Sequence, residues 1–114
     1  MRARVQEIVF DCADPAALVR FWAGLLGGDP VDRSGDWSYV DPPEFVRLAF
    51  QRVPEGKSVK NRVHLDLEVA DPDRAATDAG PAGAVRVGGL VTDEQGSFQV
   101  MWDPEGNEFC FVTG

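Results

Sequence analysis

Glu-Ile-Val-Phe-Asp-Cys-Ala-Asp-Pro at residues 7–15 recurs as His-Leu-Asp-Leu-Glu-Val-Ala-Asp-Pro at residues 64–72, an offset of 57 positions. Both segments end in Ala-Asp-Pro, and both carry an acid at the same place, Asp11 and Glu68. The offset is half of the 114 residues, so the sequence predicts a duplicated module.

Each copy begins with alternating apolar and polar residues, a period typical of a strand with one buried face. The apolar positions are Ile8, Phe10 and Cys12 in the first copy, and Val63, Leu65, Leu67 and Val69 in the second. The opposite face carries Glu7 in the first copy and His64 and Asp66 in the second. We therefore expect a helix over the apolar face of each strand, with these polar residues pointing away from it.

The two predicted helices differ in the apolar residues that they offer for packing. Asp14 and Asp71 can cap free N–H groups, and the proline after each suits the first helical position. The first helix has an apolar stripe at helical spacing, formed by Leu18, Phe21, Trp22, Leu25 and Leu26. The second offers only alanines at residues 75, 76 and 79 before Gly80-Pro81, so we expect it to be short or bent.

Three strand-like segments follow each helix, at residues 30–33, 37–40 and 46–53 and at residues 85–87, 98–102 and 108–112. The expected fold class is therefore α+β, with two tandem βαβββ modules. We expect a single domain over residues 1–114, with module one at 1–54, a linker at 55–61 and module two at 62–114.

Composition narrows the function classes. The formal net charge of −8 repels a phosphate backbone and an anionic membrane surface, so neither nucleic acid nor membrane is an expected partner. The two cysteines, Cys12 and Cys110, lack the spacing of a zinc ribbon or a disulfide framework. Reduced thiols and the absence of a signal-like apolar run in residues 1–7 favour a cytoplasmic location.

The ordered motifs resemble those of the vicinal oxygen chelate superfamily, which contains glyoxalase I, bleomycin-resistance proteins, fosfomycin-resistance enzymes and extradiol dioxygenases. The likeness is closest to its small glyoxalase-like domain members. It rests on residues 11–15, 21–22, 25–27, 48–54, 60–67 and 103–110. The resemblance implies a curved, incomplete mixed β-barrel with the helices outside, a site in its concavity, and a homodimer.

The resemblance also implies where a metal ion would bind. Ligands in metal-using members come from the first and last strands of each module, which here gives Glu7, His64 and Cys110. The matching place in the first half falls on Ala49, Phe50 or Gln51. Cys110 stands where a hard carboxylate is expected, and the chain has one histidine, so we expect no metal cofactor, with zinc as the alternative.

Several residues are candidates for direct contact with a ligand. Glu7 and His64 are the candidate catalytic residues, with Glu7 as a general base if burial raises its pKa. The candidate ligand-binding residues are Trp37, Phe50, Gln51, His64, Asp66, Trp102 and Cys110. Most of them have a structural alternative: Phe50 and Cys110 as core, either tryptophan at a dimer interface, His64 as a hydrogen-bonded strand residue, and Asp66 as a solvated acid on the sheet face.

Three functions are compatible with these residues. The favoured one is a metal-free protein that sequesters a small aromatic or cationic compound, as bleomycin-resistance relatives do. The second is a metal-dependent lyase, isomerase or transferase acting on a substrate with vicinal oxygens. The third is a structural or regulatory dimer with an empty cup.

Overall fold

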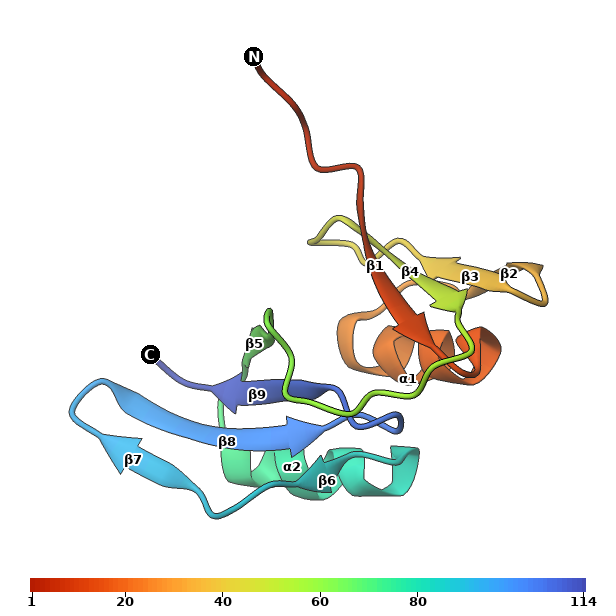
Figure 1. Cartoon of the computed structure of the whole chain (residues 1–114). Coiled ribbons are helices and arrows are strands. Elements are labelled where there is room, and N and C mark those ends of the chain that lie inside the picture. Colours follow the sequence, from red (N-terminus) through yellow and green to blue (C-terminus); the bar gives the residue numbers. More distant parts are fainter. The chain divides into compact units, whose positions relative to one another are not determined.

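The computed structural model describes residues 1–114, which divide into two compact units, residues 1–56 and residues 57–114 (Figure 1). Each unit has one open sheet with one α-helix packed on it, in the order strand, helix, then further strands. The predicted α+β class and the two βαβββ modules are thus confirmed, and neither sheet closes on itself.

The first unit follows the prediction closely. Its elements are β1 (Glu7–Cys12), α1 (Pro15–Leu26), β2 (Val31–Ser34), β3 (Trp37–Val40) and β4 (Arg47–Arg52). The sheet order is β1-β4-β3-β2, with β1 and β4 parallel and the other pairs antiparallel. The Asp14 side chain accepts a hydrogen bond from the Ala17 N–H, which fixes the start of α1. The apolar face of α1 buries Trp22, whose ring centroid lies 5.4 Å from that of Phe10 on β1.

The second unit has one more strand than the four that were predicted. Its elements are β5 (Leu65–Glu68), α2 (Pro72–Ala79), a 3₁₀ turn η1 (Gly80–Ala82), β6 (Val85–Arg86), β7 (Val91–Asp93), β8 (Gly96–Trp102) and β9 (Glu108–Val112). The sheet order is β5-β9-β8-β6, and β7 also pairs with β8. Both β6 and β7 run antiparallel to β8, so they are one edge strand interrupted at residues 87–90, where Gly88-Gly89 lies.

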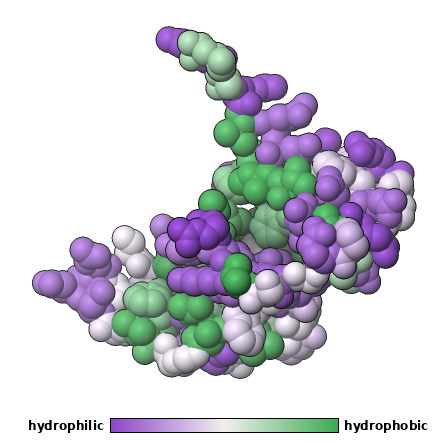
Figure 2. Space-filling model, viewed as in Figure 1, coloured by the Kyte–Doolittle hydropathy of each residue, from purple (hydrophilic) through white to green (hydrophobic).

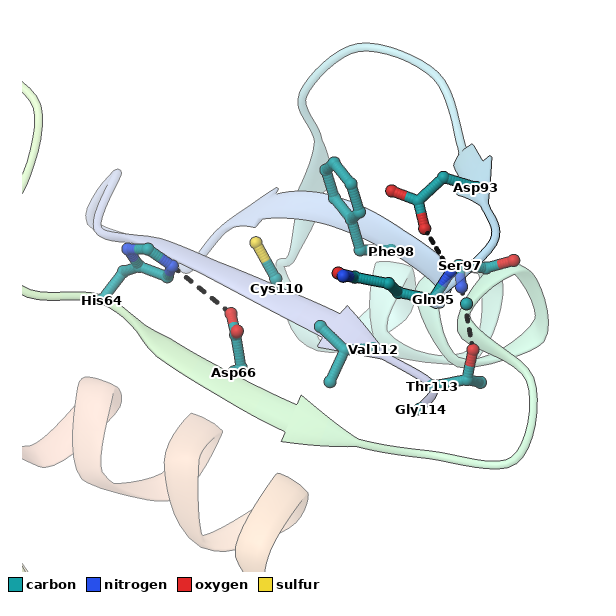
Figure 3. Close-up of a pocket in the computed structure, with 11 residues that line it drawn as sticks. His64, Asp66, Asp93, Gln95, Ser97, Phe98, Cys110, Val112, Thr113 and Gly114 are labelled. Carbon is teal, nitrogen blue, oxygen red and sulfur yellow. Dashed lines mark hydrogen bonds and ion pairs between the residues drawn. The ribbon is translucent and has the colours of Figure 1, made fainter.

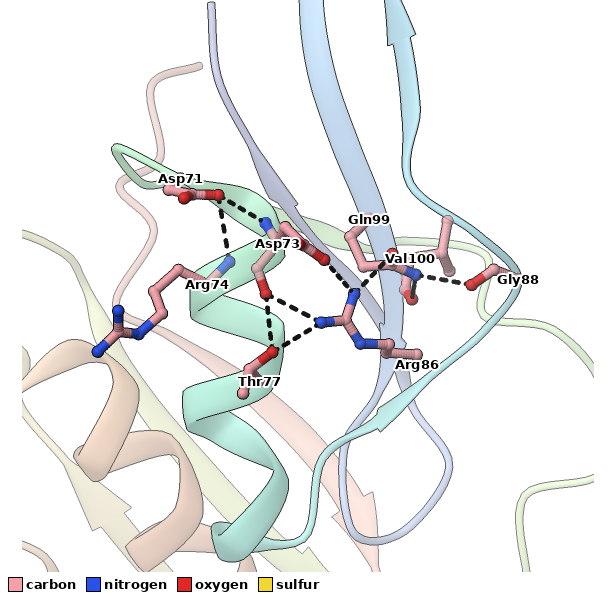
Figure 4. Close-up of polar contacts among 8 residues, drawn as sticks. All are labelled: Asp71, Asp73, Arg74, Thr77, Arg86, Gly88, Gln99 and Val100. Atoms are coloured by element: carbon pink, nitrogen blue, oxygen red, sulfur yellow. Dashed lines mark hydrogen bonds and ion pairs between the residues drawn. The ribbon is translucent and has the colours of Figure 1, made fainter.

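Helix α2 is short, as predicted, and buries only Pro72, Ala76 and Ala79. A polar network compensates for this small apolar face (Figure 4). The Arg86 guanidinium on β6 donates to the Asp73 carboxylate and carbonyl and to the Thr77 hydroxyl, each at 2.9 Å. It also donates to Gln99 Oε1 at 3.3 Å, and Gln99 is fully buried on β8. Arg86 therefore joins the helix to the edge and the interior of the sheet.

The segment of the second unit that precedes β5, residues 57–62, is attached to the sheet through Glu108 on β9. The Glu108 carboxylate accepts hydrogen bonds from the Asn61 N–H at 2.7 Å and the Lys57 ammonium at 3.1 Å, while the Asn61 amide donates to the Glu108 carbonyl. Burial acts to raise the pKa of Glu108, but the Asn61 and Lys57 contacts outweigh it and leave this pKa below its usual value. The ionised Glu108 carboxylate therefore stabilises the folded state fully above the pKa of Glu in the unfolded chain, about 4.3. This stabilisation is lost as pH falls through the lower pKa that Glu108 has in the folded protein.

We expect Glu108→Gln to speed tryptic cleavage after Lys57, Lys60 and Arg62, because the amide loses the charged contact that holds this segment. Cleavage rates at neutral pH measure the effect. The matched control is Glu55→Gln, which also removes one negative charge, two residues before Lys57. Equal cleavage rates in the two variants would show that Glu108 does not hold the segment.

Candidate functional site

The face of the second sheet that points away from α2 carries a pocket of about 400 Å³ (Figure 3). His64, Asp66 and Cys110 lie at one end of it, and Asp93, Gln95 and Ser97 lie at the other. Phe98 and Val112, which are paired across β8 and β9, lie between the two ends. The pocket therefore has an apolar middle and a carboxylate at each end.

The strand register explains why these side chains share one face. Asp66 on β5 is paired with Cys110 on β9, and Cys110 is paired in turn with Val100 on β8. The residues of the opposite parity, such as Phe109 and Phe111, are buried on the helix side. The period of two predicted from the sequence thus separates a core face from a face that is open to a ligand.

His64, Asp66 and Cys110 form a compact polar cluster at their end of the pocket. His64 Nε2 lies 3.3 Å from Asp66 Oδ1, and one donor atom from each of the three residues lies within 4.8 Å of the others. Burial raises the pKa of the Cys110 thiol, and Asp66 raises it further, while Lys60 acts weakly against both. The thiol is therefore protonated near neutral pH, which makes it a poor nucleophile.

The first unit holds the remaining predicted residues except Trp102. Glu7 is paired with Arg47, and Trp37 with Gln51, on the sheet face away from α1. The Arg33 guanidinium stacks 4.7 Å from the centroid of the Trp37 ring. Trp102 is 42% exposed at the end of β8 and does not line the pocket described above.

Phe50 corrects one expectation. It was a candidate for ligand contact, but it is 0% exposed and its ring lies 5.2 Å from that of Phe10, beneath α1. Phe50 is therefore a core residue, which was the structural alternative to ligand contact. The parity of β4 sends Phe50 to the helix side, and the flanking Ala49 and Gln51 to the other side.

The register also settles which residue of the first unit matches Cys110. Val9 and Asp66 occupy the same place in the repeat; Val9 is paired with Ala49, and Asp66 with Cys110. Ala49 is therefore the counterpart of Cys110, and a methyl group cannot bind a metal ion. Of the set Glu7, His64 and Cys110, the last two lie together, and Asp66 joins them as a third donor.

Sequence reasoning missed the far end of the pocket. Asp93 lies on β7, Gln95 in the turn that follows, and Ser97 on β8. Neither this hairpin nor the start of β8 before residue 98 was predicted. Asp93 Oδ1 accepts a hydrogen bond from the Gln95 N–H, a local turn that Asp favours. The signal that was available is the Asp-Glu-Gln-Gly sequence at residues 93–96, which is typical of a hairpin turn.

Residues 7–112 match the family described as the glyoxalase-like domain, and the chain belongs to this family. The predicted resemblance is thereby confirmed. A search among curated proteins found no significant match. Neither helix is long and apolar enough to cross a membrane. The homodimer, the cytoplasmic location and the single-domain organisation stay predictions.

Solved structures of the superfamily are similar to this chain over nearly their whole length. A glyoxalase/bleomycin resistance protein/dioxygenase family enzyme from Burkholderia phytofirmans has a TM-score of 0.80 at 19% identity, covering 97% of this chain and 98% of its own. A fosfomycin resistance protein from Mesorhizobium loti has a TM-score of 0.74 at 18% identity, and the match covers 100% of this chain and 93% of that protein. The bleomycin-binding protein of Streptomyces verticillus, complexed with copper(II)-bleomycin, has a TM-score of 0.63 at 22% identity. The match covers 100% of this chain and 99% of that protein. These likenesses establish the fold.

Proposed function

We propose that the chain binds a small organic molecule with an aromatic or apolar body and a positive charge, in the pocket on the open face of the second sheet. The observation that carries this proposal is the lining of the pocket. Phe98 and Val112 offer apolar area, and Asp66 and Asp93 offer carboxylates at its two ends. The volume of about 400 Å³ is within the range of ligand pockets.

The charge of the lining selects for cations. The pocket is lined by two aspartates and by no lysine or arginine, and the whole chain carries a net charge of −8. An anionic ligand would meet both carboxylates, whereas an ammonium or amidinium group could donate hydrogen bonds to either of them. His64, held by Asp66 at 3.3 Å, can contact a polar substituent of the same ligand.

Further apolar side chains are exposed on the second unit outside the pocket. Figure 2 shows hydrophobic residues at the surface of the part formed by β6, β7 and β8. Val85, Val91 and Trp102 are each more than 40% exposed there. Because these residues do not line the pocket, the apolar contact with a ligand there is assigned to Phe98 and Val112, whose burial contributes to affinity.

The names of two structural neighbours are compatible with a role toward small molecules. One structural neighbour is named for binding bleomycin, and another for resistance to fosfomycin. The proposal requires no metal ion, because every contact that it invokes is made by a side chain of the pocket. The proposal concerns ligand binding alone and assigns no chemical step to Glu7 or His64.

A melting assay against a matched ligand panel tests the proposal. The panel contains aromatic amines and aromatic carboxylates of equal size, beginning with benzylamine and phenylacetate. We expect amines to stabilise the protein, by about 2.7 kcal/mol at a hundred times the dissociation constant, and carboxylates to leave it unchanged.

The variant for this assay is the double substitution Asp66→Asn and Asp93→Asn, which keeps the shape of the pocket and removes its charge. It should lose the response to amines. Asp29→Asn, an exposed aspartate of the first unit, is the charge-matched control and should keep it. Equal stabilisation by amines and carboxylates, or no response to any compound, would contradict the proposal.

A further inference from the structure

The two aspartates of the pocket come from opposite edges of the second sheet. Asp66 lies on β5, at one edge, and Asp93 lies on β7, which pairs with the side of β8 that faces away from β9. Both line the same pocket on the open face of the sheet (Figure 3). The pocket thus has two separate anionic positions.

The strand register gives the distance between these positions. Three strand spacings of about 4.8 Å put β5 and β7 roughly 14 Å apart. Asp66 is level with Val100 on β8, through its partner Cys110. Asp93 is level with Gly96, four residues before Val100, which adds roughly 13 Å along the strands. The two Cα atoms would be roughly 19 Å apart in a flat sheet and are closer in a twisted one, so one ammonium group cannot contact both carboxylates.

The surface between the two aspartates is apolar. Phe98 and Val112, which are paired across β8 and β9, lie there. No other side chain of the lining is acidic, and none is a lysine or an arginine. An uncharged stretch of ligand matches this middle, whereas a charged group would be desolvated there without a partner.

Each aspartate is held by a neighbour and is still accessible to a ligand. Asp93 Oδ1 accepts a hydrogen bond from the Gln95 N–H at 2.8 Å, and the residue is exposed, so Oδ2 can accept from a ligand. Asp66 Oδ1 lies 3.3 Å from His64 Nε2, and the Asp66 side chain is 56% exposed. Both carboxylates are therefore oriented before a ligand binds, which reduces the entropy that binding costs.

We propose that the ligand of this pocket carries two positive charges, one at each end of an extended, uncharged body, as an α,ω-diamine or a bis-amidine does. One charged end binds Asp66 and the other binds Asp93, while the body lies on Phe98 and Val112. This inference rests on the proposed cation binding and adds the number and the spacing of the charges.

The spacing sets the length of the ligand. An extended chain gains roughly 1.2 Å per bond, so two nitrogens joined by about eight to ten carbons are roughly 11–14 Å apart. A charge-assisted hydrogen bond of about 2.8 Å at each end brings the total close to the separation of the two aspartates. A diamine of four carbons is too short to reach both.

Calorimetric titration with matched monoamines and diamines at one salt concentration tests the inference. We expect 1,8-diaminooctane to bind at least about fivefold more tightly than octylamine, the upper range for one added exposed ion pair. The shorter 1,4-diaminobutane should show no comparable advantage over butylamine. A diamine that binds no more tightly than octylamine would overturn this inference and leave cation binding standing, whereas binding of no amine at all would contradict both.

Single variants locate the two charges. Asp66→Asn and Asp93→Asn should each lower the affinity for 1,8-diaminooctane to that for octylamine. Octylamine needs one carboxylate only, so it should keep most of its affinity in either variant, which also shows that the variant is folded. Asp29→Asn, the charge-matched control, should change neither affinity. A diamine advantage that survives in one of the two pocket variants would show that this aspartate is no second anchor, and would overturn the inference.

Discussion

Trp22→Ala is expected to cost about 3–5 kcal/mol of the free energy of unfolding, the typical loss for a buried tryptophan. Trp22 is 1% exposed between α1 and the first sheet, where its ring contacts those of Phe10 and Phe21. Truncation removes this contact area and leaves a cavity that the surrounding strands can fill only in part. Denaturant unfolding measures the loss, and amide exchange should place it in residues 1–56.

The control for this prediction is Trp102→Ala. Trp102 is 42% exposed on β8, so the same truncation removes much less buried area there. A loss in Trp22→Ala no greater than that in Trp102→Ala would show that α1 does not depend on this side chain.

Arg86→Ala is expected to destabilise the second unit by about 1.5–3 kcal/mol. The substitution removes four hydrogen bonds, two to Asp73 and one each to Thr77 and Gln99. It also leaves the buried Gln99 Oε1 without this donor, which is more costly than the loss of an exposed contact. Because α2 buries only small side chains, it has little apolar packing to compensate. Amides of residues 72–79 should lose protection from exchange first.

Arg74→Ala is the matched control, because it removes the same side chain from α2 itself. Arg74 pairs with Asp78 at 3.1 Å in an exposed i, i+4 arrangement, which contributes only about 0.3–0.5 kcal/mol. Equal losses in Arg74→Ala and Arg86→Ala would show that the network is no more than a surface ion pair.

The repeat and the first helix could be predicted because their signals are local. Asp14 caps α1, and the apolar stripe from Leu18 to Leu26 has the helical period, so the element is determined within one stretch of chain. The weak second helix was also predictable, since it lacks large apolar side chains. These features need no knowledge of which strands become neighbours.

The edge strand and half of the pocket could not be predicted in this way. The split into β6 and β7 depends on how residues 87–90 leave the edge of β8, which is a tertiary feature. The face on which Phe50 lies was ambiguous because Leu48, Ala49 and Phe50 are consecutive apolar residues without alternation, and all three are 0% exposed in the structure. The pairing of β4 with β1 supplies the parity that its apolar sequence does not.

The central claim is that the open face of the second sheet holds a small cationic ligand. Chemical-shift mapping during titration with the aromatic amine that stabilises the protein most tests it directly. We predict saturable shifts at Asp66, Phe98, Cys110 and Val112, all with one dissociation constant. Saturable shifts confined to the helix side of the sheet, around Arg86 and Gln99, would contradict the claim.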